Sequence, residues 1–109
     1  MTSPATLPIP VAAALEAANA GNIEDFLHAF ADDGAVDDWG REFRGQEAIR
    51  GWSDAELIGK QVTLEVTGVR TEGDTTTVSA QVGGNGFNGP SDFAFTVAGD
   101  RIALMRITG

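Results

Sequence analysis

The apolar residues of this chain recur at helical spacing before residue 60 and at every second position after it. Residues 11–20 place Val11, Leu15 and Ala18 on one helical face, and residues 62–67 alternate strictly between apolar and polar side chains. The first pattern is typical of a helix, and the second is typical of a strand with one buried face. This change of period predicts an α+β fold, in which helices pack on one side of an antiparallel sheet.

Local signals predict where the elements begin and end. A first helix stops at Gly21, and a second begins with Asn22 as its N-cap and ends at Asp32-Asp33-Gly34. The third helix is expected over residues 46–58. Gly68 breaks the strand pattern and predicts a bulge or a bend in that strand. A short hairpin is expected before the third helix, and its first strand ends at Asp38. The remaining expected strands cover residues 62–67, 76–82, 92–97 and 101–108.

Length and charge narrow the classes of function. The chain of 109 residues has the size of one domain, spanning residues 1–109. Its 7 basic and 16 acidic side chains give a net charge of −9, which argues against binding to nucleic acid or to an anionic membrane surface. No stretch approaches the roughly 20 apolar residues of a membrane span, so we expect a cytoplasmic protein.

The composition also argues against bound metal. The chain has no cysteine and one histidine, so a thiolate site and a multi-histidine site are impossible. Asp37 and Asp38 are adjacent in an expected strand and should point to opposite faces. We therefore predict no metal and no cofactor.

Three segments carry a resemblance to a known family. They are Asn19-Ala20-Gly21-Asn22, then residues 31–38 (ADDGAVDD), then residues 44–50 (RGQEAIR). Their order and spacing are similar to those of the nuclear transport factor 2-like superfamily, which includes ketosteroid isomerases and SnoaL-like polyketide cyclases. With the closing hairpin at residues 91–107, the resemblance covers most of the chain. It implies a cone-shaped, cystatin-like fold: three N-terminal helices packed on a curved antiparallel sheet that encloses a pocket.

The likeness to ketosteroid isomerases implies two catalytic residues. Asp38 matches the family's general base, and Asp92 matches the protonated aspartic acid that stabilises the enolate. The ligand-binding residues that it implies are Trp52, Ala14, Ala94 and Met105, to which we add Trp39 as a candidate wall of the cavity. The implied function is an enzyme that isomerises or cyclises a small apolar carbonyl compound.

The chain departs from the family at two of these positions. It contains no tyrosine, and Ala14 stands where the family carries a tyrosine that also stabilises the enolate. Ala94 stands where an aromatic wall is usual. The smaller side chains imply a ligand other than a steroid.

The strand after Pro90 has two faces that the sequence does not distinguish. Asp92, Ala94 and Thr96 point one way, and Phe93 and Phe95 point the other. We predict that Asp92 faces the pocket. The alternative is that the phenylalanines pack on the helices and that Asp92 is solvated. The first reading leaves an outer apolar face, and it predicts a homodimer through the sheet residues Phe93, Phe95, Ile102 and Leu104.

Other functions remain open at this point. Asp38 could be an ordinary solvated acid of a hairpin turn, and the cavity could bind an apolar metabolite without catalysis. The chain could also be a dimeric interaction domain, its cone closed by Trp52 and Met105. Acid-assisted epoxide hydrolysis, known in the superfamily, needs an arginine between two acids. The sequence places none there, because Arg106 alternates away from Met105.

Overall fold

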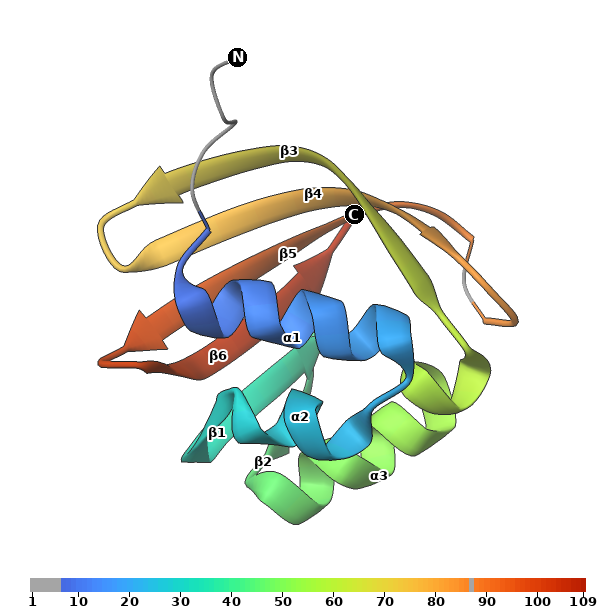
Figure 1. Cartoon of the computed structure of the whole chain (residues 1–109), viewed down its shortest axis with the longest axis horizontal. Helices are drawn as coiled ribbons and strands as arrows, with labels where there is room; N and C mark the ends of the chain where they lie inside the picture. Colours follow the sequence, from blue (N-terminus) through green and yellow to red (C-terminus); the bar gives the residue numbers. More distant parts are fainter. Residues whose placement is uncertain (1–6, 87) are drawn as a thin grey trace.

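The computed structural model describes residues 7–86 and 88–109 and arranges them as three α-helices against one curved sheet of six strands (Figure 1). The predicted α+β class is confirmed. The helices are α1 (Ile9–Ala20), α2 (Ile23–His28) and α3 (Gln46–Glu56), with a 3-10 turn at Ile58–Lys60. The strands are β1 (Phe30–Asp38), β2 (Arg41–Arg44), β3 (Thr63–Glu72), β4 (Thr75–Gly83), β5 (Gly89–Ala98) and β6 (Arg101–Thr108).

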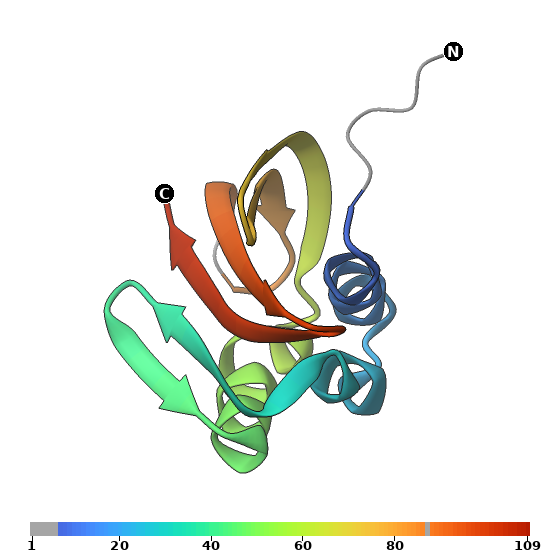
Figure 2. The same ribbon diagram turned by 90° about the vertical axis from the view of Figure 1, so that its left-hand side faces the viewer.

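The sheet has the strand order β2-β1-β6-β5-β4-β3. Strand β1 runs parallel to β6, and every other neighbouring pair is antiparallel. Strands β3 to β6 arch over α1, and the view turned by 90° shows the sheet curling around the helical layer (Figure 2). The predicted bulge is confirmed, because the pairing of β3 with β4 shifts register between Val66 and Gly68. No helix in the described part of the chain is long and apolar enough to cross a membrane.

Both predicted signals at the junction of α1 and α2 are present. Gly21 ends α1 with φ 73°, in the left-handed region that glycine adopts without strain. The Asn22 side chain accepts a hydrogen bond from the backbone N–H of Asp25, as an N-cap does. The end of α1 is also fixed to the sheet, because the side-chain amide of Asn19 exchanges two hydrogen bonds with the backbone of Leu64, at 2.7 and 3.1 Å.

The start of β1 differs from the expectation. Helix α2 ends at His28, and the acidic segment that should have ended it is already part of β1. Gly34 explains how the strand fits there: a Cβ atom at this position would lie 2.8 Å from the carbonyl oxygen of Ile102 on β6. A glycine therefore permits a close backbone approach where the β1–β6 register shifts.

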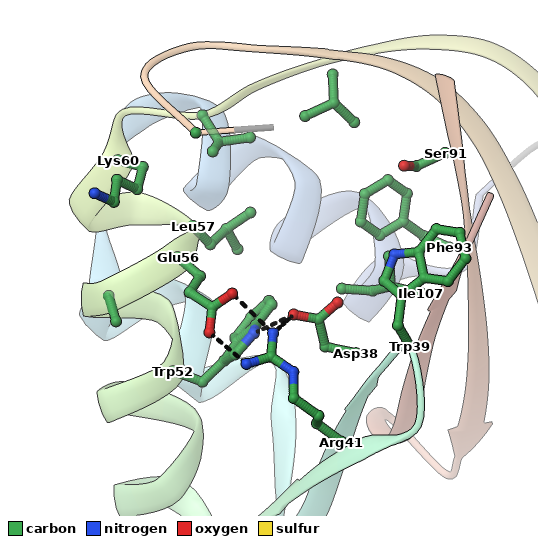
Figure 3. A pocket seen from close by; sticks show the side chains of 14 residues that line it. Asp38, Trp39, Arg41, Trp52, Glu56, Leu57, Lys60, Ser91, Phe93 and Ile107 are labelled. Atoms are coloured by element: carbon green, nitrogen blue, oxygen red, sulfur yellow. Dashed lines mark hydrogen bonds and ion pairs between the residues drawn. The ribbon is translucent and has the colours of Figure 1, made fainter. Parts of the chain in front are cut away.

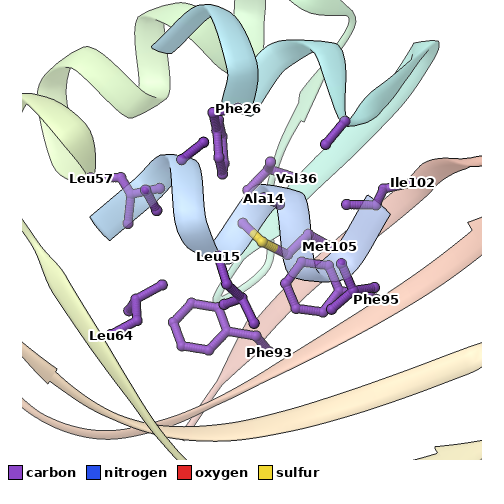
Figure 4. Packing of buried hydrophobic residues seen from close by; sticks show 14 of the residues in the cluster. Ala14, Leu15, Phe26, Val36, Leu57, Leu64, Phe93, Phe95, Ile102 and Met105 are labelled. Atoms are coloured by element: carbon purple, nitrogen blue, oxygen red, sulfur yellow. The ribbon is translucent and has the colours of Figure 1, made fainter. Parts of the chain in front are cut away.

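The core lies between the helices and the inner face of the sheet. Phe93 and Phe95 of β5 are 4% and 1% exposed, and their rings lie beneath α1 beside Leu15 and Met105 (Figure 4). Burying a side chain of this size contributes about 1.5–3 kcal/mol. The phenylalanines therefore fix which face of β5 points inward, and Asp92, Ala94 and Thr96 of that strand point outward.

This orientation corrects the predicted dimer surface. Phe93, Phe95 and Ile102 are buried in the core of one chain, so they cannot form an outer apolar face. Leu104 is partly exposed on the outer face, because the β5–β6 register shifts between Thr96 and Val97 and changes the alternation of β6 after Ile102. The homodimer itself stays a prediction, but the outer apolar face from which it was predicted is not present on β5.

Candidate functional site

A cavity of about 320 Å³ opens between α3 with its 3-10 turn and the inner face of the sheet (Figure 3). Its wall is mostly apolar, with four charged side chains and one hydroxyl. The lining residues are Asp38, Trp39, Arg41, Trp52, Ala55, Glu56, Leu57, Lys60, Val62, Val82, Gly86, Ser91, Phe93 and Ile107.

Asp38 is the buried acid of this cavity. It is the last residue of β1 and is 8% exposed. Its Oδ2 accepts a hydrogen bond from Nε1 of Trp52 at 3.0 Å and another from the Arg41 guanidinium at 2.6 Å. Among the described residues, no hydrogen bond reaches its Oδ1, which points into the cavity (Figure 3). One oxygen is thus held by the protein, and the other is free to meet a ligand.

Arg41 connects the Asp38 carboxylate to α3. Its guanidinium also donates two hydrogen bonds to the carboxylate of Glu56, at 2.8 and 3.0 Å. The hydrogen bond to Glu56 raises the pKa of Arg41 above its ordinary range, and the charge of Asp38 adds to this effect. The same hydrogen bond from Arg41 lowers the pKa of Glu56. Arg41 therefore partners the buried charge of Asp38 and fixes the mouth of the cavity, where it is itself half exposed.

The hairpin between β1 and β2 presents Trp39 at this mouth. Trp39 and Gly40 have φ angles of 54° and 91°, the signs required at both central positions of a type I′ turn. A bulky residue rarely adopts positive φ, and such strain costs about 1–3 kcal/mol. The Trp39 indole is 63% exposed and packs closely on Gly109, where a Cβ atom would lie 2.9 Å from the ring. The turn thus holds an aromatic ring at the opening of the cavity.

The structure brings three of the predicted site residues together. Asp38, Trp39 and Trp52 all line the cavity, and Asp38 and Trp52 are joined by a hydrogen bond. Ala14 and Met105 are 1% and 2% exposed within the hydrophobic core and are not among the lining residues.

Two further predicted positions, Asp92 and Ala94, lie on the outer face of the sheet and not in the cavity. Asp92 is exposed on the outer face of the sheet, where its carboxylate accepts a hydrogen bond from the Ser79 hydroxyl at 2.8 Å. Ala94, two residues further along β5, shares that face. The physical reason is the burial of Phe93 and Phe95, which selects the alternative orientation of the strand. Asp92 therefore cannot donate a proton or a hydrogen bond inside the cavity.

Sequence reasoning missed four polar lining residues, Arg41, Glu56, Lys60 and Ser91, although two of them had a signal. Arg41 stands directly opposite Asp38 in the β1–β2 hairpin, so its side chain faces the same way. Glu56 follows Trp52 by four residues and shares its helical face. Ser91, 5% exposed on β5, had no signal apart from the orientation of that strand.

Comparison with known proteins agrees with this architecture. The sequence model of the SnoaL-like domain matches residues 11–105. The chain belongs to the SnoaL-like domain family. No curated protein sequence matches it significantly.

Solved structures of similar proteins share the SnoaL-like fold. A candidate polyketide cyclase from Sinorhizobium meliloti is 28% identical, with a TM-score of 0.83 over 94% of this chain and 95% of that one. A protein with a ketosteroid isomerase-like fold from Catenulispora acidiphila, solved in complex with trimethylamine, is 27% identical, with a TM-score of 0.80 over 95% and 87%. A cystatin-fold protein from Novosphingobium aromaticivorans, 15% identical, has a TM-score of 0.81 over 93% and 96%.

Proposed function

We propose that this SnoaL-like protein is an acid/base enzyme that isomerises or cyclises a small apolar carbonyl compound, with Asp38 as the base. The single observation that carries the proposal is the placement of the Asp38 carboxylate. Its Oδ2 is held by Trp52 and Arg41, and its Oδ1 faces an apolar cavity. A general base needs this combination of fixed orientation and a free oxygen within reach of the substrate.

The chemistry begins with removal of a proton from the carbon next to the carbonyl group. Asp38 Oδ1 takes that proton, and the electron pair of the broken C–H bond moves into an enolate. In an isomerisation, Asp38 returns the proton to a different carbon. In a cyclisation, the enolate carbon forms a bond to a second carbonyl carbon, whose oxygen then takes the proton. The likeness to the candidate polyketide cyclase supports the second version.

The walls of the cavity support an apolar substrate of limited size. Trp52, Leu57, Phe93 and Ile107 supply aromatic and aliphatic surface around Asp38. A volume of about 320 Å³ lies at the lower end of the range for ligand cavities, roughly 300–1,000 Å³. A molecule of one or two rings fits this space better than a steroid does.

Non-catalytic binding of an apolar metabolite is the second candidate, and the position of Asp92 favours it. With that residue on the outer face, the cavity lacks the protonated aspartic acid of ketosteroid isomerases. Epoxide hydrolysis is less favoured, although Arg41 does lie between two acids. The hydrogen bond from Arg41 lowers the pKa of Glu56, so Glu56 is a poor donor of a proton to an epoxide oxygen.

Hydrogen–deuterium exchange of small ketones separates these functions. The protein is incubated in D₂O with cyclohexanone, 1-indanone and 1-tetralone, and the loss of the proton next to the carbonyl is followed by NMR. The proposal predicts exchange above the buffer rate that falls by about 10²-fold or more in Asp38→Asn. Asp37→Asn is the matched control, because Asp37 is adjacent but faces Arg106 on the other side of the sheet. Saturable binding of the ketones without proton exchange would contradict the proposed enzyme. It would favour a protein that binds an apolar metabolite without catalysis.

A further inference from the structure

Trp39 occupies a turn position that does not suit a large side chain. The hairpin closes at the pair Asp38 and Arg41, and its two central residues, Trp39 and Gly40, both have positive φ. Such a turn favours Asn-Gly, because asparagine tolerates the left-handed region and a bulky residue rarely adopts it. Backbone strain of this kind persists mainly at functional sites, so the strain at Trp39 points to a role for its indole.

Exposure of the indole is a second cost at the same residue. In the described part of the chain, three large apolar side chains are exposed, and Trp39 is the only aromatic one among them. Its backbone is held in place, since the Trp39 N–H donates a hydrogen bond to the carbonyl oxygen of Ile107 at 3.2 Å. One edge of the ring packs on Gly109, directly after β6. The ring is thus supported along one edge, and 63% of the residue surface stays open.

The indole lies within reach of a molecule that reacts at Asp38. The two residues are consecutive, with Cα atoms about 3.8 Å apart, and both line the same cavity (Figure 3). In a ketone fused to a benzene ring, such as 1-indanone, the carbon that loses the proton is two bonds from that ring. Asp38 Oδ1 can therefore meet this carbon while the benzene ring rests on the Trp39 indole.

We propose that Trp39 stacks on an aromatic ring of the ligand and makes the cavity selective for aromatic ketones. The inference rests on the proposed function, because it names the class of substrate that meets Asp38. Two aromatic rings attract each other beyond the effect of the area that they bury. A saturated ring with the same carbon skeleton buries a comparable area without this attraction. The ligand class is therefore a small ketone attached to or fused with a benzene ring.

The test measures the dissociation constants of 1-indanone and of its fully hydrogenated analogue, octahydroinden-1-one, by isothermal titration calorimetry. The two probes share one carbon skeleton and one carbonyl group, and only 1-indanone is aromatic. Wild type should bind 1-indanone more tightly. In Trp39→Asn this preference should shrink by about 2- to 13-fold, the contribution of one aromatic pair. Asparagine suits the turn, so this variant should fold, and urea denaturation checks that it does.

Trp39→Phe is the matched control, because it keeps an aromatic ring at the same turn position. It should retain a preference for 1-indanone that Trp39→Asn has lost. Three results would overturn the assignment of Trp39. They are an unchanged preference in Trp39→Asn, an equal loss of preference in both variants, and no saturable binding of 1-indanone to the wild-type protein.

Failure of this inference is distinguishable from failure of the proposed function. Proton exchange that depends on Asp38, together with a preference that does not depend on Trp39, would reject the role of Trp39 alone. If the exchange assay fails while Trp39→Asn still removes the preference, Trp39 is the aromatic wall of a protein that binds aromatic ketones without catalysis.

Discussion

Nε1 of Trp52 lies 3.0 Å from Oδ2 of Asp38, and this hydrogen bond joins the middle of α3 to the end of β1. An indole N–H donates only, so the bond fixes one carboxylate oxygen as the acceptor. Together with Arg41, which binds the same oxygen, it orients the other oxygen toward the cavity. The orientation of the candidate base therefore depends on packing between a helix and a strand that are distinct layers of the fold.

Trp52→Phe removes this donor while keeping an aromatic ring in the core. Asp38 is then buried with one hydrogen bond fewer, and we expect the free energy of unfolding to fall by about 1–3 kcal/mol. Urea denaturation measures this change. Trp39→Phe is the control, since the Trp39 indole is 63% exposed and a smaller loss is expected there. Equal losses in the two variants would show that the bond to Asp38 contributes nothing specific.

Glu56→Gln should lower stability in a pH-dependent way. The hydrogen bond from Arg41 holds the folded-state pKa of Glu56 below its ordinary value of 4.5. The stability from this pair is therefore fully present above pH 4.5 and is lost as pH falls through the lower folded-state pKa. Both side chains are about half exposed to solvent, which screens the pair, so we expect a difference of about 0.2–1 kcal/mol at pH 7.

The measurement is urea denaturation of wild type and Glu56→Gln at pH 7 and at pH 3. The difference between the two proteins should shrink at the lower pH. Glu65→Gln serves as control, because Glu65 makes no ion pair among the described residues. A difference that grows on acidification would contradict the pairing of Glu56 with Arg41.

Asp92→Asn should leave ligand binding unchanged. The side chain is exposed on the outer face, and asparagine keeps the oxygen that accepts the bond from Ser79. Calorimetry with 1-indanone should give a dissociation constant within 2-fold of wild type. A loss of 10-fold or more would mean that Asp92 reaches the cavity, as the likeness to ketosteroid isomerases first implied.

Asn19→Ala should loosen the attachment of α1 to β3. The side chain of Asn19 satisfies both the N–H and the C=O of Leu64 on this edge strand. Loss of these two hydrogen bonds should lower the free energy of unfolding by about 1–3 kcal/mol. Asn85→Ala is the comparison, since Asn85 bonds an exposed glutamine side chain and should cost less. Thermal denaturation of both variants checks the ranking, and a reversed order would refute this role of Asn19.

Much of the fold was predictable because its signals are local. Gly21, Asn22 and Gly68 act through their own backbone or through hydrogen bonds to residues nearby in the chain, and all three occur where expected. The start of β1 was missed because Asp32 and Asp33 resemble a helix stop. What makes this segment a strand is its contact with β6, which Gly34 permits and which no local pattern reveals.

The site was predicted only in part, because the side chains of a strand alternate between two faces and the alternation alone does not identify the buried face. Alternation on β5 separates Asp92 from Phe93 but does not say which of them faces the helices. The burial of large aromatic side chains decides it, and that burial depends on the position of α1. Asp38 and Trp52 were found through family resemblance, whereas Arg41 and Glu56 follow from the hairpin pairing and the helical spacing once the fold is known.

The most direct test of the account is a crystal structure of the protein with 1-indanone. The central claim is that Asp38 Oδ1 meets the ligand inside the cavity lined by Trp52 and Phe93. We predict electron density for the ketone in that cavity, with the carbon next to its carbonyl group beside Asp38 Oδ1. A cavity closed by its own side chains, or a ketone bound on another surface while Asp38 faces only Arg41 and Trp52, would contradict the account.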